Sequence, residues 1–116
     1  MSVEKIREIL KIYLKKALYS STKFKELIFS DDKTDYEIQS AITHLNQAFT
    51  CIQLANIQYL TYCENGECND FEEVVKAFNV FNHEFLSSYS TNHSLQWTSM
   101  EYDKFKEECE NFLTNY

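Results

Sequence analysis

The chain contains no proline and a single glycine, Gly66, among its 116 residues. These two residue types most often end helices and form the tight turns between strands, so their near absence favours a few long helices. Hydrophobic residues make up 44% of the chain and include nine Phe and eight Tyr, which is ample for a packed core. The length is that of one domain, and we expect a single all-α domain over residues 1–116.

Four segments repeat apolar residues at intervals of three and four, the spacing of one helix face. This periodicity predicts helices over about residues 3–29, 35–63, 70–88 and 99–114. Short connections usually join neighbouring antiparallel helices, so we expect an antiparallel up-down four-helix bundle. Residues 20–22 weaken the first stripe and leave room for a kink. The expected stripes are Val3, Ile6, Leu10, Tyr13, Ala17, Ser20, Phe24 and Leu27; Ile38, Ile42, Leu45, Phe49, Ile52, Asn56, Tyr59 and Cys63; Phe71, Val74, Phe78, Phe81 and Phe85; and Tyr102, Phe105, Cys109, Phe112 and Tyr116.

Polar residues that cap helix N-termini stand near each expected start. Ser2 precedes the first helix, and three Ser, Thr or Asn residues are followed three positions later by glutamate, the pattern of a capping box. The three pairs are Thr34 with Glu37, Asn69 with Glu72, and Thr98 with Glu101. Before the last helix, Leu95 and Trp97 are expected to pack back onto the core. In the second helix, Ala41, Ala48 and Ala55 recur every seven residues and predict close approach of a neighbouring helix.

The segment CENGEC, residues 63–68, has two cysteines around the glycine. It supplies only half of a four-ligand zinc site, and the acidic residues beside it disfavour a reactive thiolate. A disulfide between Cys63 and Cys68 is sterically feasible but disfavoured in a reducing cytosol. We interpret the segment as a turn: Cys63 ends the second helix, Asn65 and Gly66 form a left-handed turn, and Cys68 precedes the next helix. The reduced, metal-free chain is therefore expected to stay folded.

Catalytic patterns are not apparent in the sequence. Ribonuclease bundles of the HEPN type carry an Arg and a His a few residues apart on one helix, whereas here no histidine closely follows the only arginine, Arg7. The Glu-x-x-His pairs of di-iron bundles are also missing. Loss of RNA cleavage on replacing His44 or His83 by alanine is the result that would reveal a degenerate nuclease of this kind. We expect no catalysis and no metal or other cofactor.

Charge is unevenly distributed along the chain. The formal net charge is −7, yet the first 29 residues sum to +4 and the remaining 87 to −11. An acidic body repels phosphate backbones and attracts cationic surfaces, so a basic protein partner fits better than nucleic acid. The carboxylates of the last two helices form either such a docking surface or a solvated face.

The second helix has no formally charged side chain between Glu37 and Glu64, and Leu54, Ile57 and Leu60 lie behind its main apolar stripe. A helix that is apolar nearly all round is normally buried on several sides, so this one is either central in the fold or contacts another protein. We predict that partner binding involves both features. The predicted binding residues are Leu54, Ile57, Leu60, Glu72, Glu73, Glu101, Asp103, Glu107, Glu108 and Glu110.

These features favour a small acidic protein that binds and inhibits a protein partner, in the manner of immunity proteins, antitoxins or phage inhibitors. The alternative is a homo-oligomeric bundle, such as a homodimer, with a structural or small-ligand role and a self-interface at Leu54, Ile57 and Leu60. A degenerate HEPN-like ribonuclease is the third hypothesis. The N-terminus MSVEKIREIL lacks the apolar run of a signal peptide, and no run of about 18 apolar residues occurs, so we expect a cytoplasmic protein without membrane spans.

Overall fold

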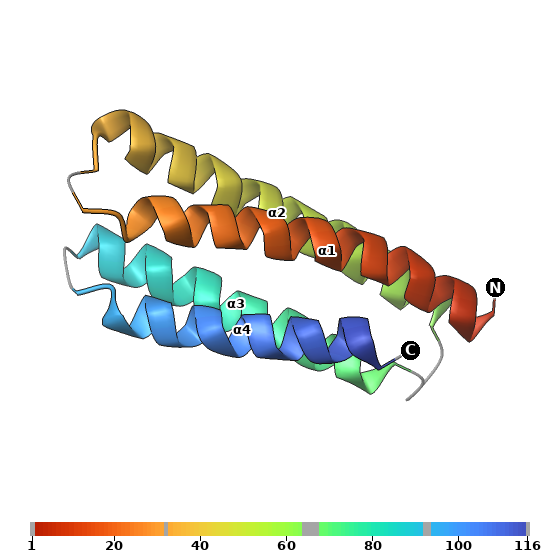
Figure 1. The fold of residues 1–116 in the computed structure, drawn as a ribbon. Helices are drawn as coiled ribbons and strands as arrows, with labels where there is room; N and C mark the ends of the chain where they lie inside the picture. The colour runs from red at the N-terminus through yellow and green to blue at the C-terminus, as the bar shows by residue number, and fades with distance from the viewer. Residues whose placement is uncertain (1, 32, 64–67, 92–93, 116) are drawn as a thin grey trace.

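The computed structural model describes residues 2–31, 33–63, 68–91 and 94–115. These residues form four helices, α1 (Val3–Ile28), α2 (Asp35–Tyr62), α3 (Asn69–Ser90) and α4 (Gln96–Thr114), and no strand occurs among them (Figure 1). The bundle measures 48 × 22 × 21 Å, and its long dimension is close to the roughly 42 Å expected of a 28-residue helix. The helices therefore run the length of the molecule.

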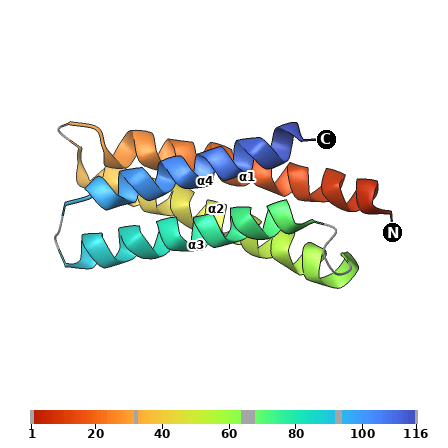
Figure 2. The ribbon, with the colours of Figure 1, turned by 90° about the horizontal axis from the view of Figure 1, so that it is seen from below.

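Successive helices run in opposite directions and form two layers, α1 with α2 and α3 with α4 (Figures 1 and 2). Helix α1 packs against α2 and α4, and α3 packs against α4 and α2, which leaves α2 and α4 on one diagonal of the bundle. The tightest packing lies within each layer, and the α2–α3 contact is the sparsest. The prediction of an all-α, up-down four-helix bundle is confirmed.

Helix α1 continues without a break through Ser20, Ser21 and Thr22, where the sequence left room for a kink. Ser20 and Ser21 are buried, and the Thr22 hydroxyl donates to the Leu18 carbonyl one turn earlier at 2.8 Å. The Thr22 hydroxyl is thus satisfied within its own helix, whereas the buried Ser21 hydroxyl has no hydrogen-bond partner among the described residues. Their positions on the stripe thus serve packing rather than termination.

Two of the predicted caps are confirmed. The Ser2 hydroxyl accepts from the Lys5 amide, and Thr34 and Glu37 bond reciprocally as a capping box. The other two predictions are wrong. Cys68 precedes α3 with no side-chain cap, and Glu72 accepts instead from the Tyr59 hydroxyl of α2.

Helix α4 begins at Gln96, three residues before its predicted start, so Thr98 lies within the helix and is buried. The Ser94 hydroxyl accepts from the Gln96 amide at 3.2 Å, which helps to satisfy this end of the helix. Leu95 packs against the core as predicted, whereas Trp97 is 59% exposed and does not.

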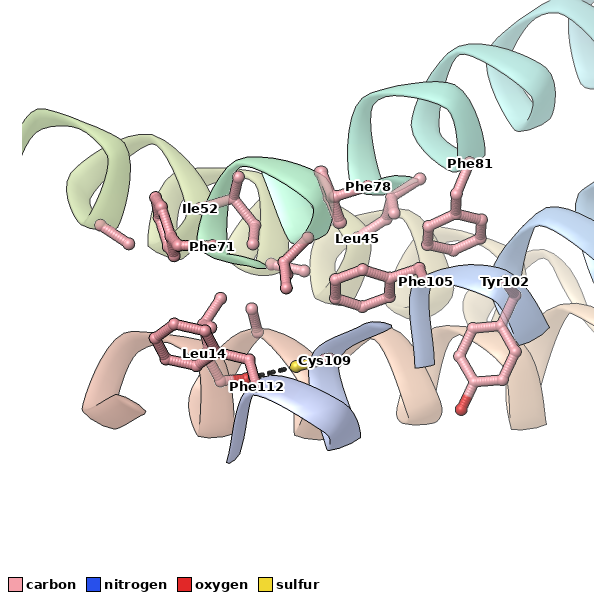
Figure 3. Packing of buried hydrophobic residues seen from close by; sticks show 14 of the residues in the cluster. Leu14, Leu45, Ile52, Phe71, Phe78, Phe81, Tyr102, Phe105, Cys109 and Phe112 are labelled. Atoms are coloured by element: carbon pink, nitrogen blue, oxygen red, sulfur yellow. Dashed lines mark hydrogen bonds between the residues drawn. The ribbon is translucent and has the colours of Figure 1, made fainter. Parts of the chain in front are cut away.

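Aromatic rings of α3 and α4 meet in the core with aliphatic side chains of α1 and α2, such as Leu14 and Leu45 (Figure 3). Phe81 is fully buried and contacts the rings of Phe24, Phe78, Tyr102 and Phe105, at centroid separations of 5.7 to 6.1 Å. Most of these pairs are edge to face, the arrangement that the ring quadrupole favours. The predicted stripes of α3 and of the described part of α4 are confirmed as core; Tyr116 lies outside the described residues.

The buried face of α2 differs from the predicted stripe. Its alanines, Ala41, Ala48 and Ala55, are fully buried, whereas Phe49 is 41% exposed and Asn56 is half-buried. Small side chains let α1 approach closely, and this rotates the larger residues of the predicted stripe toward the surface. A similar shift in α1 buries Leu14 and Ile28 in place of the predicted Tyr13 and Leu27.

Candidate functional site

The predicted binding residues are distributed over both layers of the bundle. Leu54, Ile57 and Leu60 are exposed on α2, in one layer, whereas Glu73 and Glu107 line a groove between α3 and α4, in the other layer (Figure 1). The separation follows from the bundle geometry, because α2 and α4 are diagonal to each other. The two groups still meet at one point, because Glu72 of α3 accepts a hydrogen bond from Tyr59 of α2.

A groove of about 370 Å³ between α3 and α4 collects four of the predicted carboxylates. They share the lining with two lysines and two apolar side chains, so acidic groups outnumber basic ones two to one. We call these residues the acidic surface: Glu73, Lys76, Ala77, Val80, Glu101, Lys104, Glu107 and Glu108.

Helical spacing explains why these carboxylates meet. Glu101, Lys104 and Glu108 follow one another at intervals of three and four on α4, so they form a single row. Glu101 pairs with Lys104 at 3.4 Å, and the lysine side chain is 64% exposed. The Lys104 ammonium can therefore exchange this contact for a partner's charge at small cost, whereas the Glu101 side chain is only 18% exposed.

Exposed apolar side chains accompany the acidic surface. Val80 within it is 47% exposed, and Trp97 precedes Glu101 by one helical turn, so it extends the same row of α4. Trp97 is 59% exposed. A large aromatic side chain left in water beside charged groups is typical of binding surfaces.

Three predicted carboxylates do not line this groove. Asp103 pairs with Lys25 of α1 at 3.6 Å, and Glu72 accepts the Tyr59 hydroxyl of α2. Burial, and then the hydrogen bond to Glu72, raises the pKa of Tyr59. These two carboxylates link helices to one another, while Glu110 is exposed on α4 outside the groove.

In the other layer of the bundle, Leu54, Ile57 and Leu60 are 43%, 56% and 70% exposed. The interpretation of α2 as a central helix is therefore wrong: the three side chains are not covered by any described part of the chain. Their exposure supports the remaining interpretation, a contact with another molecule.

Helix α1 adds a row of lysines and apolar residues beside them. A second groove, of about 560 Å³, lies between the two helices and is lined by Lys16 and Tyr19 of α1 and by Thr50 and Cys51 of α2, among others. Lys23 lies over the Tyr19 ring at 5.6 Å, so it belongs to the same row. We define the α1–α2 surface as Lys5, Ile12, Lys16, Tyr19 and Lys23 with Leu54, Ile57 and Leu60.

The antiparallel register brings the apolar parts of this surface together. Lys16 and Cys51 line the same groove, so Ile12, one turn before Lys16, lies level with Leu54, about one turn after Cys51. Ile12 is 55% exposed. The surface thus combines an apolar centre with lysines along one edge, on a chain whose net charge is negative.

Arg7, the single arginine of the chain, is buried. Its guanidinium binds both carboxylate oxygens of Asp70, with N–O distances of 3.1 and 2.6 Å, and lies 4.4 Å from the centre of the Phe112 ring. These contacts join α1, α3 and α4 at one end of the bundle. The polar partner of Arg7 lies 63 positions away in sequence, and no local pattern marks the pair.

The cysteines occupy two kinds of environment. Cys68 and Cys109 are fully buried free thiols, and Cys51 is a half-buried one. Burial, and then the charge of Glu110, raises the pKa of Cys109 to about 12, and its thiol donates to the Leu14 carbonyl (Figure 3). The predicted turn at Asn65 and Gly66 lies outside the described residues.

Thiol labelling tests this difference. In the native protein, Cys68 and Cys109 are expected to react with a maleimide far more slowly than Cys51 and Cys63, because both are inaccessible unless the bundle opens. Mass spectrometry of peptides after timed labelling measures each site, with urea-unfolded protein as the control in which all four react. Equal native rates for Cys68 and Cys51 would contradict this packing.

The histidines lie apart from any described cluster. His44 on α2 is half-buried, with Nδ1 buried and no hydrogen-bond partner for that atom in the described structure, and His83 on α3 is exposed. Within residues 2–31, 33–63, 68–91 and 94–115, no group of three or more His, Cys, Asp or Glu side chains has an arrangement able to hold a metal ion.

Among the described residues, no helix has the length and apolar character that a bilayer crossing requires. Comparison of the chain with protein-family models, curated proteins and solved structures finds no match.

Proposed function

We propose that this protein binds a basic protein partner through the acidic surface and inhibits it, without catalysis of its own. The observation that carries the proposal is the gathering of Glu73, Glu101, Glu107 and Glu108 around one groove. The two helices that form the groove hold nine acidic and three basic residues, whereas α1 holds three acidic and seven basic ones. Negative charge is therefore concentrated on one side of the molecule.

Such a surface is complementary to a partner whose functional site is positively charged. Opposite charges steer the two proteins together and raise the association rate, and carboxylates can occupy a cleft that otherwise takes phosphate groups. Trp97 and Val80 supply apolar contact area beside the charges. A toxin or nuclease domain that binds nucleic acid has the matching chemistry, and this chain would then act as immunity proteins, antitoxins and phage inhibitors do.

The test begins with the partner, sought among proteins encoded beside this one and by pull-down from the native host. Reversing two charges, with Glu73→Lys and Glu107→Lys together, is expected to weaken binding about 10- to 100-fold, mainly by slowing association. Surface plasmon resonance at low and high salt measures both rates. The effect should shrink as salt is added, because the charges are exposed.

The matched control reverses two exposed carboxylates of α1, Glu4→Lys with Glu8→Lys, and changes the net charge equally. It is expected to leave affinity within about threefold of wild type at physiological salt, where screening confines charge effects to about 8 Å. Equal losses in both double variants would show that only the net charge matters. Failure to recover any stable partner would also count against the proposal.

A further inference from the structure

We propose that the α1–α2 surface of one molecule docks onto the acidic surface of a second copy, so that the chain associates with itself head to tail. The starting observation is that each layer of the bundle has its own groove (Figure 1). The groove between α1 and α2 is lined by Lys16 and Tyr19 among others, and the groove between α3 and α4 is lined by four glutamates. The α1–α2 surface carries lysines, and the acidic surface carries mostly glutamates.

Charge is the first element of the match. The α1–α2 surface has three lysines, Lys5, Lys16 and Lys23, and no carboxylate among its defining residues, and α2 contributes no charged side chain from residue 38 to its end. Of these lysines, Lys23 pairs with Glu26 in its own helix, through a solvent-exposed contact of 3.4 Å. The acidic surface has four glutamates against two lysines.

Apolar contact is the second element. Ile57 and Leu60 are 56% and 70% exposed; Val80 of the acidic surface is 47% exposed, and Trp97, in the same row of α4, is 59% exposed. Covering such side chains with one another removes apolar area from water at both partners. The net negative charges repel each other over the whole molecule, whereas the lysines and glutamates of a docked pair lie within a few Å of each other, where the attraction between opposite charges is strongest.

Geometry fixes the kind of assembly. Since the two surfaces lie in different layers of the bundle, each molecule that uses one of them still offers the other, and rows form rather than closed pairs. The inference shares the acidic surface with the proposed function but requires no outside partner. Association of this kind would hide the acidic surface from a partner until the protein is diluted or the partner competes for it.

Sedimentation velocity with purified full-length protein tests the inference. The weight-average mass is expected to rise above the monomer value of 13.8 kDa with increasing protein concentration at about 50 mM salt, and to return toward it at about 0.5 M salt as the charges are screened. Two double variants, Lys16→Glu with Lys23→Glu and Glu73→Lys with Glu107→Lys, should each stay monomeric, because like charges then meet.

Mixing the two double variants is the decisive step. Each retains one native surface that complements the native surface of the other, so the mixture is expected to associate although neither variant does so alone. The variant Leu60→Gln, at a side chain exposed enough to leave the fold intact, should shift half-association to about tenfold higher concentration with unchanged helical circular dichroism.

Two results would overturn the inference. One is a wild-type protein that stays monomeric at millimolar concentration and low salt. The other is a dimer that persists in the variant Glu73→Lys with Glu107→Lys and is abolished by Leu54→Glu. That result would indicate symmetric pairing through α2. The variant Lys16→Glu with Lys23→Glu separates this inference from the proposed function, because its acidic surface is intact. It should no longer associate with itself, and it should still bind an outside partner.

Discussion

Replacing Phe81 by alanine is expected to lower the free energy of unfolding by about 4 kcal/mol, the largest loss from a single side chain that this structure predicts. Phe81 is fully buried and its ring meets four others from α1, α3 and α4. Truncation leaves a cavity at the point where three helices join, and rigid neighbouring rings cannot collapse into it. Urea titration followed by circular dichroism measures the change.

The matched control is Leu86→Ala on the same helix. Leu86 is 53% exposed, so its removal should cost less than about 1 kcal/mol. Together the pair separates loss of core packing from loss of helix propensity, because both substitutions introduce the same residue into α3. Similar costs at the two positions would mean that Phe81 is not at the centre of the core.

Replacing Arg7 by alanine is expected to lower the free energy of unfolding by about 3 kcal/mol. The substitution removes a guanidinium that is 4% exposed, leaves the Asp70 carboxylate without its bidentate partner, and takes away the group that packs over Phe112. Arg7→Lys should recover only part of the loss, since an ammonium cannot bind both oxygens in the same fork. Lys5→Ala, at an exposed position of the same helix, should stay within about 0.5 kcal/mol of wild type.

The pH dependence of stability gives an independent measure of the same contact. Burial alone would raise the pKa of Asp70, but its hydrogen bonds and charge interaction with Arg7, together with the backbone amides of Asp70 and Phe71, outweigh burial and lower it. A lowered pKa means that Asp70 stabilises the fold above its ordinary pKa of about 3.9 and loses this contribution as pH falls through the folded-state value. The stabilities of wild type and Asp70→Asn should therefore differ at neutral pH and converge in acid. A constant difference across that range would show that the carboxylate charge is not what stabilises.

Local sequence patterns were sufficient to predict much of the fold. The spacing of Phe71, Val74, Phe78 and Phe81 defines the buried face of α3 because an aromatic stripe has only one favourable place, the core. The capping box of Thr34 and Glu37 marks the start of α2 because both partners lie within one turn. The capping-box pattern of Thr98 and Glu101 predicted the wrong start for α4. The helix begins at Gln96, so Thr98 lies within it and is buried.

The candidate site was less accessible to sequence reasoning. Glu73 and Glu107 were identified as surface carboxylates, but the same reasoning selected Glu72 and Asp103, which bond to Tyr59 and Lys25 on neighbouring helices. Helical periodicity predicts that a residue faces outward, but it does not predict which residue of an adjacent helix contacts it.

The sequence by itself determined the number, order and approximate limits of the helices, and most of the core, because these depend on interactions within a few turns. The repeat of Ala41, Ala48 and Ala55 also predicted the close approach of a neighbouring helix to α2. Only the tertiary structure decided that Phe49 of the predicted stripe lies at the surface and that Arg7 reaches Asp70. Tertiary packing also set Ile57 and its exposed neighbours apart from the acidic groove, because the rotation of each helix about its axis is fixed by how closely its partners approach. The two surfaces, and hence both proposals, depend on that rotation.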